Sequence, residues 1–155
     1  MKTLARDADQ AEILRRLHAL RNDSARRWGR MSAHQTVCHL SDGYRMLLGQ
    51  RPTELVASPL PRPIVRLIAL YVPLQWPKGR LSTTPELDQR AGGGTKPVDF
   101  NEDVAELARL LGAIVHMPGD QFASQRHPFF GRMSESSWLR WAYLHADHHL
   151  RQFGL

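Results

Sequence analysis

Cysteine and long apolar runs are scarce in this 155-residue sequence, and each shortage excludes a class of protein. Cys38 is the only cysteine, so the chain can form no internal disulfide and contains no CxxC zinc motif. No uncharged stretch exceeds eleven residues, and the one at 67–77 is interrupted by Pro73. Because a bilayer-spanning helix needs about 20 apolar residues, we expect no membrane span. The first residues, MKTLARDADQ, lack the apolar core of a signal peptide, so we expect a soluble cytoplasmic protein.

The composition is that of an ordinary globular protein. Hydrophobic residues make up 42% and charged residues 23%, and the length suits a single domain over residues 1–155. Lys and Arg number 21 against 15 Asp and Glu, which gives a formal net charge of +6. The cluster Arg26, Arg27 and Arg30 could contact phosphate, but no nucleic-acid motif accompanies it. We therefore expect a solvated surface there and no nucleic-acid partner.

Apolar residues recur at helical spacing in four long segments, which are flanked by signals that start or stop a helix. Ser32 and Gln35 form a capping box before the second segment, and Ser134 caps the fourth. Pro63 suits the first turn of a shorter helix. The predicted helices cover residues 7–22, 32–48, 64–72, 99–116 (capped by Asp99 or Asn101) and 134–152.

Proline separates the second and the third long helix. Eight of the ten prolines lie between Pro52 and Pro97, where they would interrupt helical hydrogen bonding. We therefore predict a long crossover there, including a mobile loop over residues 79–98, and an irregular segment over residues 117–133. No stretch alternates convincingly between apolar and polar residues, so the sequence predicts an all-α bundle.

Histidine is the unusual component, because three of the eight histidines fall within five residues. His145 and His149 are four residues apart, so on a helix both imidazoles point to one side and can bind one ion. His148 diverges from His145 by about 60° and is a weaker candidate. The pair is not a metalloprotease motif, since Ala146 stands where HExxH has its glutamate.

A metal site needs a third ligand from another element, and His39 is the best candidate. It lies midway along the second helix, about 130° from the centre of that helix's apolar stripe, so it would face a cleft on the flank with Asp42 and Gly43. We expect Cys38 to be a small buried thiol. His18, His34 and His116 are expected at the surface or at helix ends.

The segment His127-Pro128-Phe129-Phe130-Gly131 precedes the last helix. Its ordinary role would be to pack the end of the bundle. Its alternative role is to cover the metal cleft, with His127 as a substrate contact or a proton shuttle.

Two patterns resemble a known family. Met31-Ser-x-x-Gln35-x-x-x-His39-Leu40, followed by His145-x-x-His148-His149-x-Arg151-Gln152, looks like the DinB-like superfamily. Within that superfamily, HPFFG at 127–131 together with HADHHLRQFG at 145–154 is similar to a branch catalogued as a domain of unknown function.

The resemblance implies a DinB-like four-helix bundle with up-down-down-up topology and a divalent metal on three histidines. These fall on His39, His145 and His149. Characterised relatives include transferases and isomerases that use a low-molecular-weight thiol such as mycothiol, bacillithiol or glutathione. The fold is often dimeric, so a homodimer is also implied.

Together, these observations predict a protein with zinc or nickel on the three histidines and at least one position open to water or a substrate thiolate. The substrate is unknown, and His127 and Asp42 are the candidates for a catalytic role. The residues expected to orient the ligands or wall the cleft are Asp42, Asp147, Gln152, Trp138 and Trp141. The alternatives are a hydrolase on the same site, and a non-enzymatic metal, stress-response or nucleic-acid-binding module that uses the arginine cluster.

Overall fold

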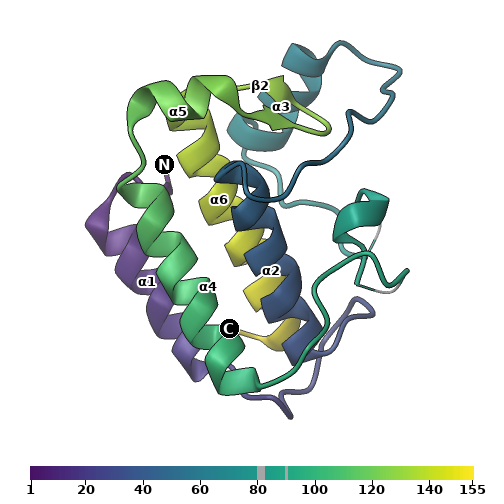
Figure 1. Cartoon of the computed structure of the whole chain (residues 1–155), viewed down its shortest axis with the longest axis vertical. Coiled ribbons are helices and arrows are strands. Elements are labelled where there is room, and N and C mark those ends of the chain that lie inside the picture. The colour runs from purple at the N-terminus through teal and green to yellow at the C-terminus, as the bar shows by residue number, and fades with distance from the viewer. Residues whose placement is uncertain (80–82, 90) are drawn as a thin grey trace.

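The computed structural model describes residues 1–79, 83–89 and 91–155, and this part of the chain is mostly helical (Figure 1). The four long helices are α1 Asp7–Ala19, α2 Ala33–Leu47, α4 Phe100–Val115 and α6 Glu135–Leu150. The shorter elements are α3 Arg62–Tyr71, η1 Pro85–Leu87, α5 Gly119–Ser124, β1 Arg126–His127, β2 Gly131–Arg132 and η2 Arg151–Phe153.

Side-chain caps start three of the long helices where the sequence predicted them. The Ser32 hydroxyl accepts the Gln35 amide at 3.1 Å, and the Gln35 side chain accepts the Ser32 amide at 2.9 Å. Ser134 caps α6, and Asp99 rather than Asn101 caps α4. These bonds satisfy amides that have no partner within the helix, so each helix begins at a defined residue.

Contacts along the bundle fix the helix directions. The Leu4 amide donates to the Leu139 carbonyl, and Arg16 pairs with Asp147, so α1 and α6 run in the same direction. α2 runs opposite to α6, because His39 meets His145 whereas Tyr44, further along α2, meets Ala142, which precedes His145 on α6.

α2 and α4 lie side by side and run in the same direction (Figure 1). His34 contacts Asp103, and Arg45, further along α2, contacts Glu106, further along α4. Two successive bundle helices that run in parallel need a connection that returns along the bundle. The predicted up-down-down-up order and its long crossover therefore follow from one geometric requirement.

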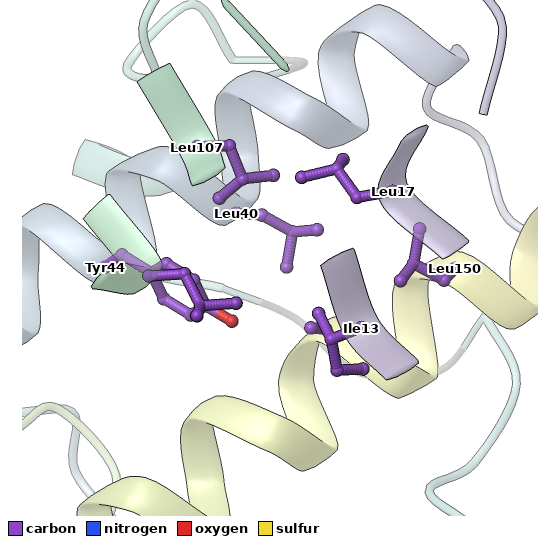
Figure 2. Close-up of a pocket in the computed structure, with 8 residues that line it drawn as sticks. Ile13, Leu17, Leu40, Tyr44, Leu107 and Leu150 are labelled. Atoms are coloured by element: carbon purple, nitrogen blue, oxygen red, sulfur yellow. The ribbon is translucent and has the colours of Figure 1, made fainter. Parts of the chain in front are cut away.

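The core fills the space between the four long helices, with little room left over. Figure 2 shows Ile13, Leu17, Leu40, Tyr44, Leu107 and Leu150 pointing into the centre. The void between them is about 10 Å³, at the lower limit for a single water molecule. This apolar void is therefore a packing gap, and any ligand site must lie elsewhere.

The crossover is more ordered than predicted. Leu87 is buried, and Gln89 and Thr95 bond to Asp42 of α2, so these points of segment 79–98 are held against that helix. Residues 80–82 and 90 of the expected mobile loop lie outside the described residues. We call residues 83–89 and 91–95 the strap.

Two further differences concern element boundaries. Segment 117–133 contains the short helix α5 and an antiparallel hairpin whose two strands have two residues each. Strands this short show no alternation of apolar and polar residues, so the sequence did not reveal them. α1 ends at Ala19, because Leu20 turns to extended backbone and is itself buried. No helix in the described part combines the length and apolarity needed to cross a bilayer. The outer face of α3 is apolar and exposed. The predicted homodimer stays a prediction.

Candidate metal centre

Three histidines from two helices meet where α2 packs against α6. His39 comes from α2, and His145 and His149 come from α6. All three are buried, and their ligand nitrogens lie within 4.8 Å of one another. The Nε2 atoms of His39 and His145 are 3.2 Å apart. The structure thus brings together the imidazoles that the sequence singled out, and the group could bind a metal ion.

Local sequence explains why the rings meet. His145 and His149 are one turn apart on α6, and their ring centroids lie 4.8 Å apart. His39 faces α6, and Gly43 follows it one turn later on α2. A Cβ atom at Gly43 would lie 3.0 Å from His145 Cε1. The missing side chain therefore lets the His145 ring lie directly against the backbone of α2.

Hydrogen-bond acceptors orient two of the rings. His39 Nδ1 lies 3.1 Å from the Leu87 carbonyl oxygen, which can only accept, so Nδ1 carries the proton. His149 Nδ1 donates to Gln152 Oε1 at 3.2 Å, in the orienting role that the sequence suggested for Gln152. The Nε2 atoms of both rings are therefore left unprotonated and available to an ion, and that of His39 faces His145.

Burial keeps the three imidazoles neutral. The pKa of His39 is lowered because burial disfavours the charged form. Burial and the neighbouring imidazoles lower the pKa of His145 and His149 well below the usual value. His145 stacks on Trp141 with centroids 4.9 Å apart, and its Nδ1 has no hydrogen-bond partner among the described residues. The centre is therefore a cluster of neutral nitrogen donors with an aromatic wall.

Trp138, the other expected wall residue, lies one layer further out. Its ring contacts Trp141 edge to face, with centroids 5.6 Å apart, and it is fully buried. Asp147 does not orient a ligand, because its carboxylate pairs with Arg16 at 2.9 Å and with Arg151.

The hydrogen bonds of Asp42 go to the strap, whereas its charge reaches the His39 ring and partly offsets the lowering of that ring's pKa by burial. Its fully buried carboxylate accepts from the Thr95 amide at 2.7 Å, the Thr95 hydroxyl at 2.6 Å and the Gln89 amide group at 3.2 Å. Arg51 pairs with the same carboxylate at 3.2 Å. Asp42 therefore influences His39 through the strap as well as by its charge, and its own catalytic role stays a prediction.

Arg51 completes the attachment of the strap. Its guanidinium donates to the Glu86 carbonyl at 2.9 Å and also to the Gly93 carbonyl. Glu86 directly precedes Leu87, whose own carbonyl accepts from His39 Nδ1, and Gly93 lies further along the strap. A partly buried ion pair thus holds the backbone that selects the tautomer of His39.

His127 lies in an aromatic cluster beside the centre, outside the three-histidine group. Its Nδ1 accepts the backbone amides of Phe129 and Phe130, and its ring stacks on Phe130 with centroids 4.3 Å apart. Burial lowers its pKa to about 3. The Trp141 ring contacts both His127 and His145, so His127 packs behind the wall of the centre. Its catalytic role stays a prediction.

His148 points away from the centre toward a cavity of about 210 Å³ between α6 and the chain that follows α3. Its ring contacts Trp28 and Trp76, and its pKa is lowered to about 4 by burial and by the charge of Arg151. The Trp76 ring is also 6.5 Å from the His145 ring. The cavity and the metal centre are therefore neighbours with Trp76 between them.

Sequence reasoning missed two features near the centre. The Leu87 carbonyl has no sequence signal, because any residue could supply it. His34 lies at a helix end as expected, in the first turn of α2, but its contact with Asp103 and its closeness to Cys38 were not foreseen. The spacing of His34 and Cys38, four residues apart on one helix, was the signal that could have revealed this contact.

Comparisons with known proteins identify a family but no function. A family profile described as "Protein of unknown function (DUF1569)" matches residues 3–154. Neither the curated proteins nor the solved structures contain a match.

Two glycines inside helices allow a matched test of the packing at His145. We expect Gly43→Ala to displace the His145 ring and to weaken binding of an added zinc ion by about tenfold or more. Gly112→Ala in α4 meets no atom within 4 Å, so it should stabilise the protein by about 0.5–1 kcal/mol and leave zinc affinity unchanged. Zinc titration and thermal unfolding measure both effects. Unchanged zinc affinity in Gly43→Ala would contradict the close packing.

The strap is tested at Asp42. Asp42→Asn places a donor group opposite the Thr95 amide and removes the charge that pairs with Arg51. We expect zinc affinity to fall by about 10-fold to 100-fold because the Leu87 carbonyl is no longer held against His39. Glu102→Gln is the control, since it also neutralises a carboxylate, but Glu102 is exposed in the first turn of α4. Equal affinities in the two variants would show that the strap does not orient the ligand.

Proposed function

The chain belongs to the DUF1569 family of the DinB/YfiT-like superfamily, and we propose that it is a divalent-metal protein whose ion binds to His39, His145 and His149. Zinc and nickel are the ions proposed, since both bind imidazole well. As its activity we propose metal-dependent transfer to or from a low-molecular-weight thiol.

The observation that carries the metal proposal is the 3.2 Å separation between the Nε2 atoms of His39 and His145. Because the Leu87 carbonyl fixes the proton of His39 on Nδ1, its Nε2 presents a lone pair to the other ring. Two imidazole nitrogens on one tetrahedral zinc, with bonds of about 2.0–2.1 Å, lie about 3.3–3.4 Å apart. The donor set and its spacing therefore fit an ion.

Different residues of the centre would bind the ion, orient the imidazole rings and cover the sides of the site. The three histidines would hold the ion, and the Leu87 carbonyl and Gln152 fix two of their rings. When bound, a divalent ion supplies a Lewis acid that lowers the pKa of a water or thiol at its remaining position. Trp141 covers one side of His145, and Trp76 lies on the side of the neighbouring cavity.

Thiol transfer is favoured over hydrolysis by the surroundings of the centre. Asp42 is engaged by its strap donors, and His127 accepts two backbone amides. Neither is placed as a ready base. A thiol needs less assistance than water to become a nucleophile, since its ordinary pKa is about 8.5. Metal-dependent hydrolysis is the second candidate on the same site.

Metal content tests the centre itself. We expect His149→Ala to lose about one equivalent of zinc or nickel per chain relative to the unmodified protein, because a three-ligand site does not survive loss of a ligand. His148→Ala is the matched control, since His148 is the adjacent residue but lies outside the group. Elemental analysis after dialysis measures both. Equal metal content in His149→Ala and the unmodified protein would overturn the proposal.

A thiol requirement distinguishes the two activities. With metal-loaded protein and a panel of electrophilic and ester substrates, we expect product only when glutathione, bacillithiol or mycothiol is added. Turnover without a thiol would support hydrolysis instead. Absence of both activities in a protein that holds its metal would favour a non-enzymatic metal-binding or stress-response role. DNA binding that is lost when Arg26, Arg27 and Arg30 are neutralised would support a nucleic-acid role.

A further inference from the structure

A second group of ligand-type side chains lies on the other side of α2. His34 Nε2 is 2.6 Å from Asp103 Oδ2, and Cys38 Sγ is 3.6 Å from the same oxygen. One ligand atom from each residue lies within 4.8 Å of those of the other two. The group therefore combines nitrogen, sulfur and oxygen donors at one point.

Two neighbouring helices build this group. His34 and Cys38 are one turn apart on α2, so their side chains leave the helix in the same direction, toward α4. Asp103 lies in the first turn of α4, next to the end of the crossover. His39 follows Cys38 directly but faces α6, because successive helical residues diverge by about 100°. The two groups are therefore separate.

We propose that His34, Cys38 and Asp103 form a second divalent-cation site, suited to a borderline-soft ion such as zinc. Imidazole, thiolate and carboxylate are all zinc ligands, and a thiolate favours zinc over calcium or magnesium. Cys38 is 1% exposed, whereas the side chains of His34 and Asp103 are 12% and 25% exposed. The sulfur is thus shielded from solvent, and the other two ligands leave a side through which an ion reaches it.

Without an ion, hydrogen bonds hold these ligands together. Asp103 Oδ2 accepts from His34, from the Cys38 thiol and from the Val98 amide. When an ion binds, the Cys38 thiol releases its proton to solvent and the sulfur binds as thiolate. His34 loses its Nε2 proton to solvent, takes up one at Nδ1 and would bind through Nε2, and Asp103 would bind as carboxylate. The ion thus replaces the bridging protons of a site that is already assembled.

The position of the site suggests what the ion does. Asp103 also accepts from the Val98 amide, at the point where the crossover rejoins the bundle. An ion held by α2 and α4 would fasten the start of α4 to the start of α2. We therefore expect it to stabilise the fold, since it binds only when both helices are in place.

Cobalt absorption tests the site directly, because Cys38 is the only sulfur ligand of its kind in the chain. Titration of the metal-free full-length protein with Co²⁺ should produce a thiolate-to-cobalt charge-transfer band in the near ultraviolet. The three-histidine centre contains no sulfur and cannot produce this band. We expect Cys38→Ser to abolish the band, and His34→Ala and Asp103→Asn each to weaken cobalt binding at this site by about tenfold or more.

Two controls separate this site from the three-histidine centre. His149→Ala should keep the charge-transfer band, so failure of the metal proposal for that centre leaves this test intact. His18→Ala removes an exposed histidine of α1 and should change nothing. Circular dichroism of each variant establishes that it is folded.

Zinc-dependent thermal unfolding provides a second measurement. In the His149→Ala background, zinc should raise the melting temperature, and the additional Cys38→Ser change should remove this shift. No charge-transfer band at saturating cobalt would overturn the proposal and leave a hydrogen-bonded cluster only. A band of undiminished affinity in both His34→Ala and Asp103→Asn would overturn it too, because Cys38 would then bind the ion without the other two residues.

Discussion

The close approach of α2 and α6 at Gly43 and His145 is the constraint on which the centre depends. It brings imidazoles from opposite ends of the sequence into one buried place, where burial keeps them neutral. A neutral buried imidazole still has one donor and one acceptor nitrogen, and each needs a partner. His39 and His149 donate to Leu87 and Gln152, and their remaining lone pairs point at the same space. Those lone pairs make the place suitable for a cation.

The crossover is part of the centre as well as a connection between helices. Two adjacent parallel helices require a long return path, and this chain uses that path to present the Leu87 carbonyl to His39. The strap is held by the buried carboxylate of Asp42 and the guanidinium of Arg51. Such a pair stabilises only when its hydrogen bonds are completed, and the Thr95 and Glu86 backbones complete them here. The path of the crossover, the Asp42–Arg51 ion pair and the orientation of the His39 ring therefore depend on one another.

The sequence predicted the features that depend on neighbouring residues. The Ser32 capping box and the His145–His149 spacing are local patterns whose geometry follows from the α-helix alone. His39 could be singled out because it lies midway along its helix, where the side chains of a facing helix are close enough to share an ion. The Leu87 carbonyl could not be predicted, since a backbone oxygen carries no residue signature and its position depends on the tertiary path of the strap.

The burial of α2 explains why so many of its polar residues have specific partners. α4, α6 and the strap all pack against this helix, so most of its polar side chains are buried or partly buried. Toward α4, His34 and Cys38 share the Asp103 carboxylate. Toward α6, His39 meets His145. Toward the strap, Asp42 accepts from Thr95. A helix that only packed a core would fill these positions with apolar residues, because an unpaired buried polar group costs about 1–3 kcal/mol. On the faces toward α4 and α6, these polar residues are the ones that would hold an ion in the two proposed sites.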